Sequence, residues 1–376
     1  MIPLAKPFFD HAELEEVKKV LDSRWVAQGP ACTAFEEKFA AYLGTRHAVS
    51  LSNCTTALHL ALVALGVKAG DEVLVSDYTF PATGNAVLHA GAKPVFVDVD
   101  TDTFNMDPDD LERKITAKSK AVMVVHTFGN PADIDAVLDV AKTHKLNVIE
   151  DAACAHGALY RGKKVGTFGD VACFSFHARK NMTTGEGGMV TTNDSRLAEH
   201  VRKLANHGIQ GAFKRQSQDT FSVPVFDELG YNYRLSDIAS AVGIAQLSKL
   251  DALIEKRTKL AHYYGAKLSK LGFAKPQKAL PHATPIFQSY VVLLDADIDR
   301  NKLIDLMKQQ GVQTTIGTYA SHVQPVYGPQ SACRVSLDVF NRTLALPMYF
   351  ELTEKQIDAV VLALDESVQA LGKSRK

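Results

Sequence analysis

One lysine of this sequence stands where covalent chemistry is possible. Lys180 lies in the stretch FSFHARKNMTTGEGG, where a segment typical of a buried strand gives way to threonines and glycines. A lysine in a partly dry pocket has a lowered pKa, and its amine becomes a nucleophile that can form a Schiff base. Ser175 adds a hydroxyl, and the glycines let the backbone approach a ligand closely. The alternatives are a solvated loop and a phosphate-binding loop, in which Lys180 or Arg179 supplies only charge.

Two further stretches have residues suited to the phosphate and the ring of a cofactor. Ser52 and Thr55 precede a long apolar segment with helical character. The free N–H groups of a helix N-terminus, beside a hydroxyl, bind anions, although a plain helix cap is the alternative. Tyr78 and Phe80 stand at the end of a predicted strand. An aromatic side chain there can stack on a flat ring, and packing in the core is the alternative.

A pair of carboxylates completes the set. Glu150 and Asp151 end an apolar segment, and a buried carboxylate is costly unless it is paired. We expect a helix cap, a metal ligand or a partner for a protonated ring nitrogen. A phosphate site, an aromatic platform, an acid and a lysine are the parts that a pyridoxal phosphate (PLP) enzyme needs. They follow one another here in the order of aspartate-aminotransferase-like enzymes.

The elements that position these residues alternate between strands and helices. The predicted strands are rich in valine and isoleucine and apolar on both faces, which is typical of a mostly parallel sheet covered by helices. Ligands bind at the carboxyl ends of such strands, where Phe80, Asp151 and Lys180 fall. We expect strands at residues 71–80, 93–100, 120–129, 147–153, 171–176 and 187–192, and helices at 11–23, 54–66, 81–91, 107–115, 133–145 and 195–208.

The chain is expected to divide into a large α/β domain, residues 1–250, and a smaller C-terminal α+β domain, residues 251–376. A polar segment without clear period, residues 210–230, predicts a long loop. A helical segment then leads out of the large domain. Its residues are 236–271, and strands at 289–298 and 312–318 and helices at 300–311 and 353–371 are predicted beyond it.

Composition and charge exclude several classes of protein. Hydrophobic residues make up 46% of the 376 residues, which supports a sizeable core. The 42 basic residues balance 42 acidic ones, so no net field recruits nucleic acid or a membrane surface. We find neither a signal-peptide pattern nor an apolar run long enough to span a bilayer. The five cysteines have no paired or metal-binding spacing, so we expect reduced thiols, a cytoplasmic location and no metal.

Together the motifs resemble the DegT/DnrJ/EryC1/StrS family of PLP-dependent nucleotide-sugar aminotransferases. The resemblance extends over essentially the whole chain, through RWVAQGP, SNCTTALHLAL, GNPADID, VIEDAACAHGA, FSFHARKNMTTGEGGMV and GYNYRLSDIASA. It implies a large domain of PLP fold type I with a mostly parallel seven-stranded sheet, plus the smaller C-terminal domain. It also implies ping-pong transamination, in which an amino acid, L-glutamate, supplies the amino group and a nucleotide-linked ketosugar accepts it. The product is an aminosugar for glycan biosynthesis, such as that of lipopolysaccharide.

The resemblance assigns catalytic roles residue by residue. Lys180 matches the lysine that holds PLP as an aldimine, and Asp151 matches the carboxylate that keeps the pyridine nitrogen protonated. Phe80 matches the aromatic residue that stacks on the ring. Cys154 stands where the family often has Gln or His in contact with the phenolic oxygen of the cofactor. A thiol is a poor hydrogen-bond donor, so we expect another group or solvent to contact that oxygen.

The phosphate site is implied in the same way. Thr55, the backbone at Cys54 and the hydroxyl of Ser175 match the family's phosphate cradle. Cys54 replaces a common glycine, which strains the backbone only if that position needs a positive φ. The GYNYR segment resembles a strip contributed by a neighbouring subunit, with Asn232 as the phosphate contact and Arg234 as a weaker candidate. The resemblance therefore implies a homodimer with a shared active site.

Two alternatives share the fold. Related PLP- or PMP-dependent sugar dehydratases carry histidine in place of the lysine, so the retained Lys180 favours transamination. A regulatory relative without turnover is disfavoured by intact Lys180 and Asp151. The sugar pocket has several candidates, of which Trp25 and His322 could equally be packing or surface residues. These candidates are Lys6, Trp25, Glu186, Tyr319 and His322.

Overall fold

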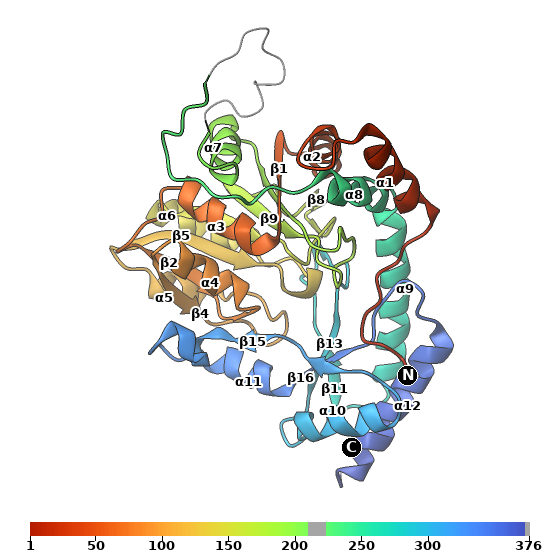
Figure 1. The fold of residues 1–376 in the computed structure, drawn as a ribbon. Coiled ribbons are helices and arrows are strands. Elements are labelled where there is room, and N and C mark those ends of the chain that lie inside the picture. Colours follow the sequence, from red (N-terminus) through yellow and green to blue (C-terminus); the bar gives the residue numbers. More distant parts are fainter. Residues whose placement is uncertain (210–222, 373–376) are drawn as a thin grey trace.

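A seven-stranded sheet forms the larger part of the structure, a computed structural model that describes residues 1–209 and 223–372 (Figure 1). In order across the sheet, the strands are β1 (His47–Leu51), β10 (Gly188–Thr192), β9 (Val171–Ser175), β6 (Asn147–Asp151), β5 (Ser119–Val125), β2 (Glu72–Ser76) and β4 (Lys93–Val97). β10 runs antiparallel to both neighbours, whereas the strands from β9 to β4 pair in parallel. The mostly parallel sheet predicted from the sequence is therefore confirmed.

Helices cover both faces of this sheet (Figure 1). Within β5, Met123 packs on one face, and Val122 and Val124 pack on the other. Successive strand residues point to opposite faces, so a sheet covered on both sides needs apolar residues at every position. The first face carries α3 (Cys54–Ala64), α4 (Ala82–His89) and α7 (Ser195–Ala205), and the second carries α2 (Pro30–Leu43), α5 (Pro108–Lys114), α6 (Ile134–His144) and α8 (Asp237–Ser248).

Several predicted boundaries are wrong. No element was predicted at residues 24–53, where α2 and β1 lie. β1 has the sequence HAVSL, whose histidine and serine interrupt the valine and isoleucine pattern of the other strands. The strand predicted at 71–80 ends at Ser76 and is followed by the short β3 (Tyr78–Thr79). The helix predicted at 236–271 is broken at Lys249 into α8 and α9 (Leu250–Leu268).

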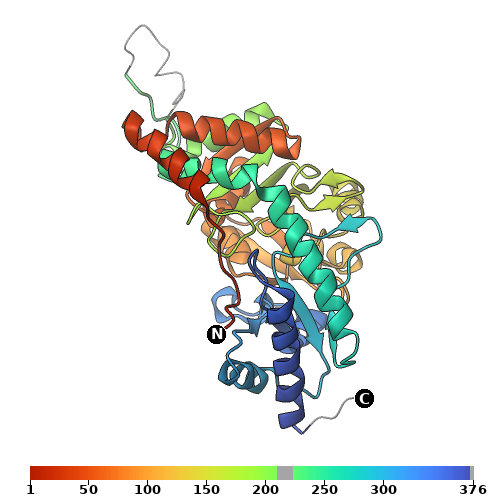
Figure 2. The same ribbon diagram turned by 90° about the vertical axis from the view of Figure 1, so that its right-hand side faces the viewer.

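A second, four-stranded sheet follows, in the order β11 (Ala274–Pro276), β13 (Tyr290–Leu294), β16 (Thr343–Leu346) and β14 (Thr315–Ile316). Its core is shared with α10 (Arg300–Gln309) and α12 (Glu354–Ala370). α9 joins the two parts of the chain, because Leu250 is buried in the core of the large sheet and Tyr264 in the core of the small one (Figure 2). The strand predicted at 312–318 is reduced to β14. The domain boundary at residue 250 stays a prediction.

The remaining elements are short or peripheral. α1 (His11–Ser23) packs against α8. Residues 210–222 of the predicted long loop lie outside the described residues. In the described part of the chain, no helix has both the length and the apolar character to cross a membrane. The other elements are β7 (Leu159–Tyr160), β8 (Lys163–Lys164), β12 (Ala283–Thr284), β15 (Tyr319–Ala320), α11 (Arg334–Arg342) and three 3-10 turns at Thr127–Gly129, Ser321–Val323 and Pro325–Tyr327.

Candidate active site

The carboxyl ends of neighbouring parallel strands bring the predicted catalytic residues together. Asp151 is the last residue of β6, and Ser175 is the last residue of the adjacent β9. After Ser175 the chain turns, and the amide of Lys180 donates to the carbonyl of His177. The Lys180 side chain donates from Nζ to Sγ of Cys154 at 3.1 Å, just beyond the end of β6. Lys180, Cys154 and Asp151 thus lie at one edge of the sheet.

The charge state of Lys180 differs from the sequence prediction. Burial has the largest influence and lowers the pKa of Lys180, as expected. The nearby thiols of Cys154 and Cys54 and the carboxylate of Asp151 outweigh burial and raise this pKa above its ordinary value of 10.5. The expectation of a lowered pKa was therefore wrong, because it counted the dryness of the pocket and not the groups around the amine.

Asp151 is a buried carboxylate with few partners. Thr83 donates its hydroxyl to Oδ2 at 2.8 Å, and the amide of Ala153 donates to Oδ1 at 3.2 Å. Burial raises the pKa of Asp151 above its ordinary value of 3.8, although Thr83, Ala153 and the charge of Lys180 act against this. Sequence reasoning missed Thr83. The sequence did contain a signal for this residue, a pair of threonines four residues apart. The hydroxyls of Thr79 and Thr83 lie 2.9 Å from each other in the structure.

Glu150 has a different role from its neighbour Asp151. It lies one position earlier in β6, so its side chain points to the opposite face of the sheet. Burial alone would raise the pKa of Glu150, but hydrogen bonds to the carboxylate hold it below the ordinary value of 4.5. The donors are Nε2 of His126 and the backbone amides of Gly166, Phe168 and Gly169. Glu150 therefore stabilises the core and takes no part in the site.

The substitution Glu150→Gln should lower the free energy of unfolding by about 3 kcal/mol at neutral pH. The amide removes a buried charge from its donors, and its NH₂ group faces backbone N–H groups that need an acceptor. Because the pKa is lowered in the folded state, the stabilisation is present above pH 4.5 and is lost as the pH falls further. Denaturant unfolding of both proteins at neutral and acidic pH measures this, and an equal gap at both would contradict it.

The N-terminus of α3 approaches the strand ends closely. Asn53 caps the helix by accepting from the amide of Thr56, whereas the first amides, of Cys54 and Thr55, have no carbonyl partner inside the helix. On the neighbouring strand, Gly188 pairs with Ser175, so the serine hydroxyl and the helix N-terminus belong to one corner. Free amides, a hydroxyl and the helix dipole fit an anion such as a phosphate group. Asn53 was not predicted as the cap.

One glycine of the glycine-rich segment is required by packing within the protein. A Cβ at Gly188 would lie 2.4 Å from the carbonyl carbon and oxygen of Asn53, so this glycine lets β10 pack against α3. Gly185 has a φ of +84°, and its backbone bridges to that of His177. Close packing of chain on chain accounts for Gly188, and the expectation that these glycines let backbone approach a ligand stays a prediction. Cys54 is the first helical residue of α3 and is not a positive-φ position, so it imposes no strain.

Phe80 and Tyr319 form an exposed aromatic pair. Phe80 is 64% exposed, and its ring centroid lies 6.2 Å from that of Tyr319. β15, which contains Tyr319, pairs with β3 and brings the C-terminal part of the chain to this edge. Tyr78, by contrast, is buried and lies 2.6 Å from the hydroxyl of Thr343. Packing is the correct interpretation for Tyr78, and a free ring face remains for Phe80.

His322 is held in place by a buried carboxylate. Its Nδ1 lies 2.7 Å from the buried carboxylate of Asp77, which also accepts from the hydroxyl of Ser336. Cys333 lies in the same cluster, with its sulfur within 4.8 Å of the Asp77 and His322 ligand atoms. The His322 side chain is only 7% exposed, so it is not an ordinary surface histidine.

The other predicted residues are dispersed. Trp25 is partly exposed and packs against Gly29. Glu186 is exposed, with a carboxylate oxygen 3.9 Å from Nε2 of His177. Asn232 is exposed, and its backbone bridges to that of Asn206. The side chain of Arg234 donates to Asn206, and the backbone of this segment pairs with Leu51 and Ser52, just before α3.

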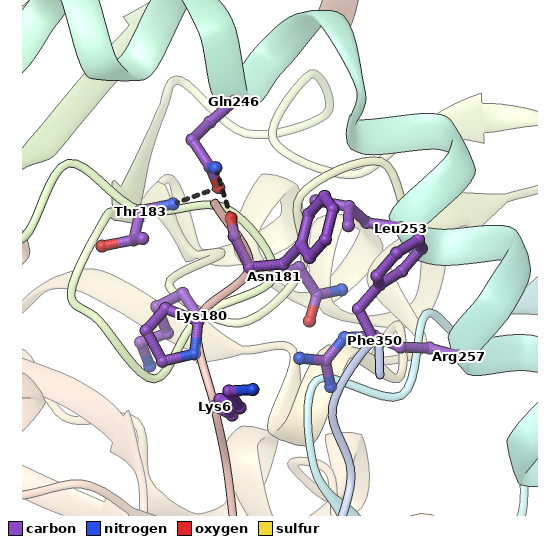
Figure 3. Close-up of a pocket in the computed structure, with 10 residues that line it drawn as sticks. Lys6, Lys180, Asn181, Thr183, Gln246, Leu253, Arg257 and Phe350 are labelled. Carbon is purple, nitrogen blue, oxygen red and sulfur yellow. Dashed lines mark hydrogen bonds between the residues drawn. The ribbon is translucent and has the colours of Figure 1, made fainter. Parts of the chain in front are cut away.

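Lys6 does come to the site. It lines the same cavity as Lys180 and forms an ion pair with Glu351 (Figure 3). Sequence reasoning gave no role to the other walls of this cavity, although Asn181 and Thr183 lie in the same motif as Lys180. These walls are Pro7, Phe8, Asn181, Thr183, Gln246, Leu253, Arg257 and Phe350.

A model of the DegT/DnrJ/EryC1/StrS aminotransferase family matches residues 7–365. The chain belongs to this family. GDP-perosamine synthase of Caulobacter vibrioides is 40% identical over 378 residues, which cover 97% of this chain and 98% of the relative. The family is PLP-dependent, so PLP is the cofactor of this DegT/DnrJ/EryC1/StrS protein.

Solved aminotransferases confirm the fold of this DegT/DnrJ/EryC1/StrS member as PLP fold type I. The aminotransferase TlmJ from Streptoalloteichus hindustanus has a TM-score of 0.93 at 32% identity, covering 99% of this chain and 100% of that one. The putative sugar aminotransferase Spr1654 from Streptococcus pneumoniae, in its PMP form, has a TM-score of 0.94 at 26% identity. That alignment covers 99% of this chain and 100% of the other.

Proposed function

We propose that this enzyme transfers an amino group from L-glutamate to a nucleotide-linked ketosugar. The observation that carries the proposal is the meeting of Lys180 and Asp151 at the strand ends, beside the corner formed by α3 and Ser175. An amine, a buried acid and an anion site are what a phosphorylated pyridine aldehyde needs. The GDP-perosamine synthase relative supports a GDP-linked sugar as the first substrate to test.

The residues present fit PLP. Lys180 would hold the cofactor covalently, and Asp151 would face the ring nitrogen. The exposed face of Phe80 is free to stack on the ring. The amides of Cys54 and Thr55 would bind the phosphate, together with the Ser175 hydroxyl as described above. PLP, when bound, supplies an electron sink for bond breaking at the donor carbon.

The chain's own residues then perform the proton chemistry. With PLP bound, Nζ of Lys180 would take a proton from the α carbon of the donor and deliver it to the carbon of the cofactor's former aldehyde group, which makes Lys180 the general base and acid. The Asp151 carboxylate would hold the proton on the ring nitrogen of bound PLP. Cys154 keeps the Lys180 amine at this edge through its contact at 3.1 Å. The donor leaves as 2-oxoglutarate before the ketosugar enters the same site, which is the ping-pong order.

The sugar pocket is proposed to form around residues at the mouth of the site. Tyr319 and Phe80 offer apolar ring faces, and His322, three residues after Tyr319, is held in place by Asp77. Lys6 supplies a positive charge at the cavity. Trp25 and Glu186, which do not line the cavity at Lys180, remain candidates for the sugar pocket. The retained Lys180 favours transamination over dehydration of the sugar, and it argues against a relative without turnover.

A substrate screen tests this function. Purified enzyme with PLP and L-glutamate is given nucleotide-linked sugars that carry a ketone at C3 or C4, with GDP, UDP, dTDP and CDP forms compared. Release of 2-oxoglutarate and formation of the aminosugar are measured together, by enzymatic assay and mass spectrometry. Aminosugar formation with at least one nucleotide is expected. Loss of sugar hydroxyl without any 2-oxoglutarate would identify a dehydratase instead.

The active site is further proposed to be shared in a homodimer. Asn232, the residue implied as a phosphate contact, is exposed to solvent, so its side chain is available to the site of another copy. Large apolar side chains on α1 and in the segments on either side of it are exposed, and exposed apolar surface of this kind is suited to contact with a second copy. They are Phe9, Leu14, Leu21, Trp25 and Val26.

Mixing two inactive variants should restore activity if Asn232 acts across the dimer. Lys180→Ala and Asn232→Asp subunits, unfolded and refolded together, form hybrid dimers in which one of the two sites has both native residues. About a quarter of wild-type activity is expected from random pairing. A mixture of Lys180→Ala and Asp151→Asn is the control, because both residues serve the same site and no intact site forms. Equal, background activity in both mixtures would contradict the shared site.

A further inference from the structure

Arg257 is a buried cation without a buried anion. It lies on α9, is 4% exposed, and donates from Nη1 to carbonyl oxygens at distances of 3.1–3.3 Å. No carboxylate among the described residues pairs with it. Burial lowers the pKa of Arg257 to about 10, so the guanidinium stays charged at neutral pH. The carbonyl partners belong to Phe287, Gln288 and Met348.

A buried charge that meets only neutral groups is costly, and its cost is recovered when an anion binds. Arg257 lines the same cavity as Lys180 and Lys6, so the cavity carries more positive than negative charge (Figure 3). Asn181 also lines it, and its Oδ1 is buried without a hydrogen-bond partner among the described residues. The ring centroids of Phe8 and Phe350 lie 4.4 Å apart at an apolar wall.

We propose that Arg257 binds the α-carboxylate of the amino donor. This inference rests on the proposed function, because it concerns the amino acid from which Lys180 takes a proton. The α-carboxylate is bonded to that carbon, so it must lie next to Lys180, whereas the distal carboxylate can lie elsewhere. Open space in the cavity is about 10 Å³, roughly that of one water molecule. The carboxylate therefore enters by moving Lys6, whose side chain is 54% exposed.

A second buried arginine gives a matched control. Arg300 on α10 is 7% exposed and donates from Nη1 to the carbonyls of Phe340 and Thr343. It does not line the cavity. Arg300→Gln therefore reports the cost of losing carbonyl contacts from a buried guanidinium, and Arg257→Gln adds the loss of the donor contact.

The test compares two amino donors that differ only in the α-carboxylate, L-glutamate and γ-aminobutyrate. Enzyme loaded with PLP, and free of sugar, is mixed with each donor, and the loss of the cofactor's visible absorbance gives an apparent Kd. Wild-type enzyme should bind glutamate at least tenfold more tightly. Arg257→Gln should weaken glutamate binding by about 10- to 100-fold and leave γ-aminobutyrate unchanged. Arg300→Gln should keep the wild-type preference and the wild-type rate of the reverse reaction with the aminosugar.

The outcomes separate this inference from the proposed function. If the wild-type band responds to no amino acid, the proposed function fails and the inference with it. If wild-type enzyme responds but Arg257→Gln keeps the full preference for glutamate, only the inference is overturned. Should Arg257→Gln not fold, Arg257→Lys keeps the charge and is expected to lose part of the preference. Wild-type enzyme that binds both donors equally would also overturn the inference.

Discussion

Lys180→Ala is expected to abolish transamination, with a fall in kcat of about ten-thousand-fold. The lysine has two functions, the covalent bond to the cofactor and the transfer of the α proton. The upper end of general acid–base catalysis alone accounts for a loss of this size. Its amine lies 3.1 Å from Cys154, and no other amine of the described residues lines the cavity at that edge except Lys6, which pairs with Glu351.

Two measurements separate this loss from a folding defect. Borohydride reduction should fix the cofactor to wild-type protein, and mass spectrometry should find no added mass on Lys180→Ala. Arg179→Ala is the matched control, because Arg179 is the adjacent, exposed cation and bonds to the described residues His177 and Gln288 through its backbone N–H and carbonyl. It should keep wild-type turnover. Wild-type turnover by Lys180→Ala, or covalent labelling of that variant at another lysine, would refute the assignment.

Asp151→Asn should lower kcat by about 10²–10³-fold while the protein still binds PLP in part. A neutral amide cannot hold the proton on the ring nitrogen, so the electrostatic support of the reacting state is lost. The absorbance of the bound cofactor, followed as a function of pH, should change along with turnover. Thr83→Val removes only the hydroxyl that donates to Asp151 and should cost about tenfold. Full activity in Asp151→Asn would contradict the assigned role.

Stability gives an independent readout of Asp151. Its pKa is raised in the folded protein, so the protonated form is favoured there, and the charged carboxylate costs stability once the pH rises above that pKa. Asp151→Asn should therefore leave the apoenzyme at neutral pH as stable as wild type or more stable. Glu150→Gln should change the stability in the opposite direction, because the pKa of Glu150 is lowered in the folded protein. A destabilised Asp151→Asn apoenzyme would indicate a structural carboxylate.

Part of this fold could be predicted from the sequence, because some strands are recognisable from their own residues alone. β5 can be recognised because its Val122, Met123 and Val124 are all apolar, as a strand covered on both faces requires. β1 could not be recognised in this way, because its short sequence has mixed polarity. Its position in the sheet depends on pairing with β10. The residue pattern of one segment does not predict which distant strand it will pair with.

The site shows the same limit. Lys180 and Asp151 follow recognisable apolar strands, so their positions were predictable. Thr83 was not, because its role depends on a contact across 68 residues of sequence. The role of Arg257 was not predictable, because nothing in the sequence of α9 indicates which carbonyl groups or which cavity its guanidinium will contact. The direction of the Lys180 pKa shift needed the thiols and carboxylate that folding places around the amine.

The alternation of side chains along β6 has a consequence for inherited variation. Glu150 and Asp151 are consecutive residues that face opposite sides of the sheet. Variants at position 150 should reduce how much protein a cell accumulates, since unfolded chains are degraded. Variants at position 151 should leave the amount of protein unchanged and remove its enzymatic activity. One peptide bond thus separates a site where selection acts on abundance from one where it acts on chemistry.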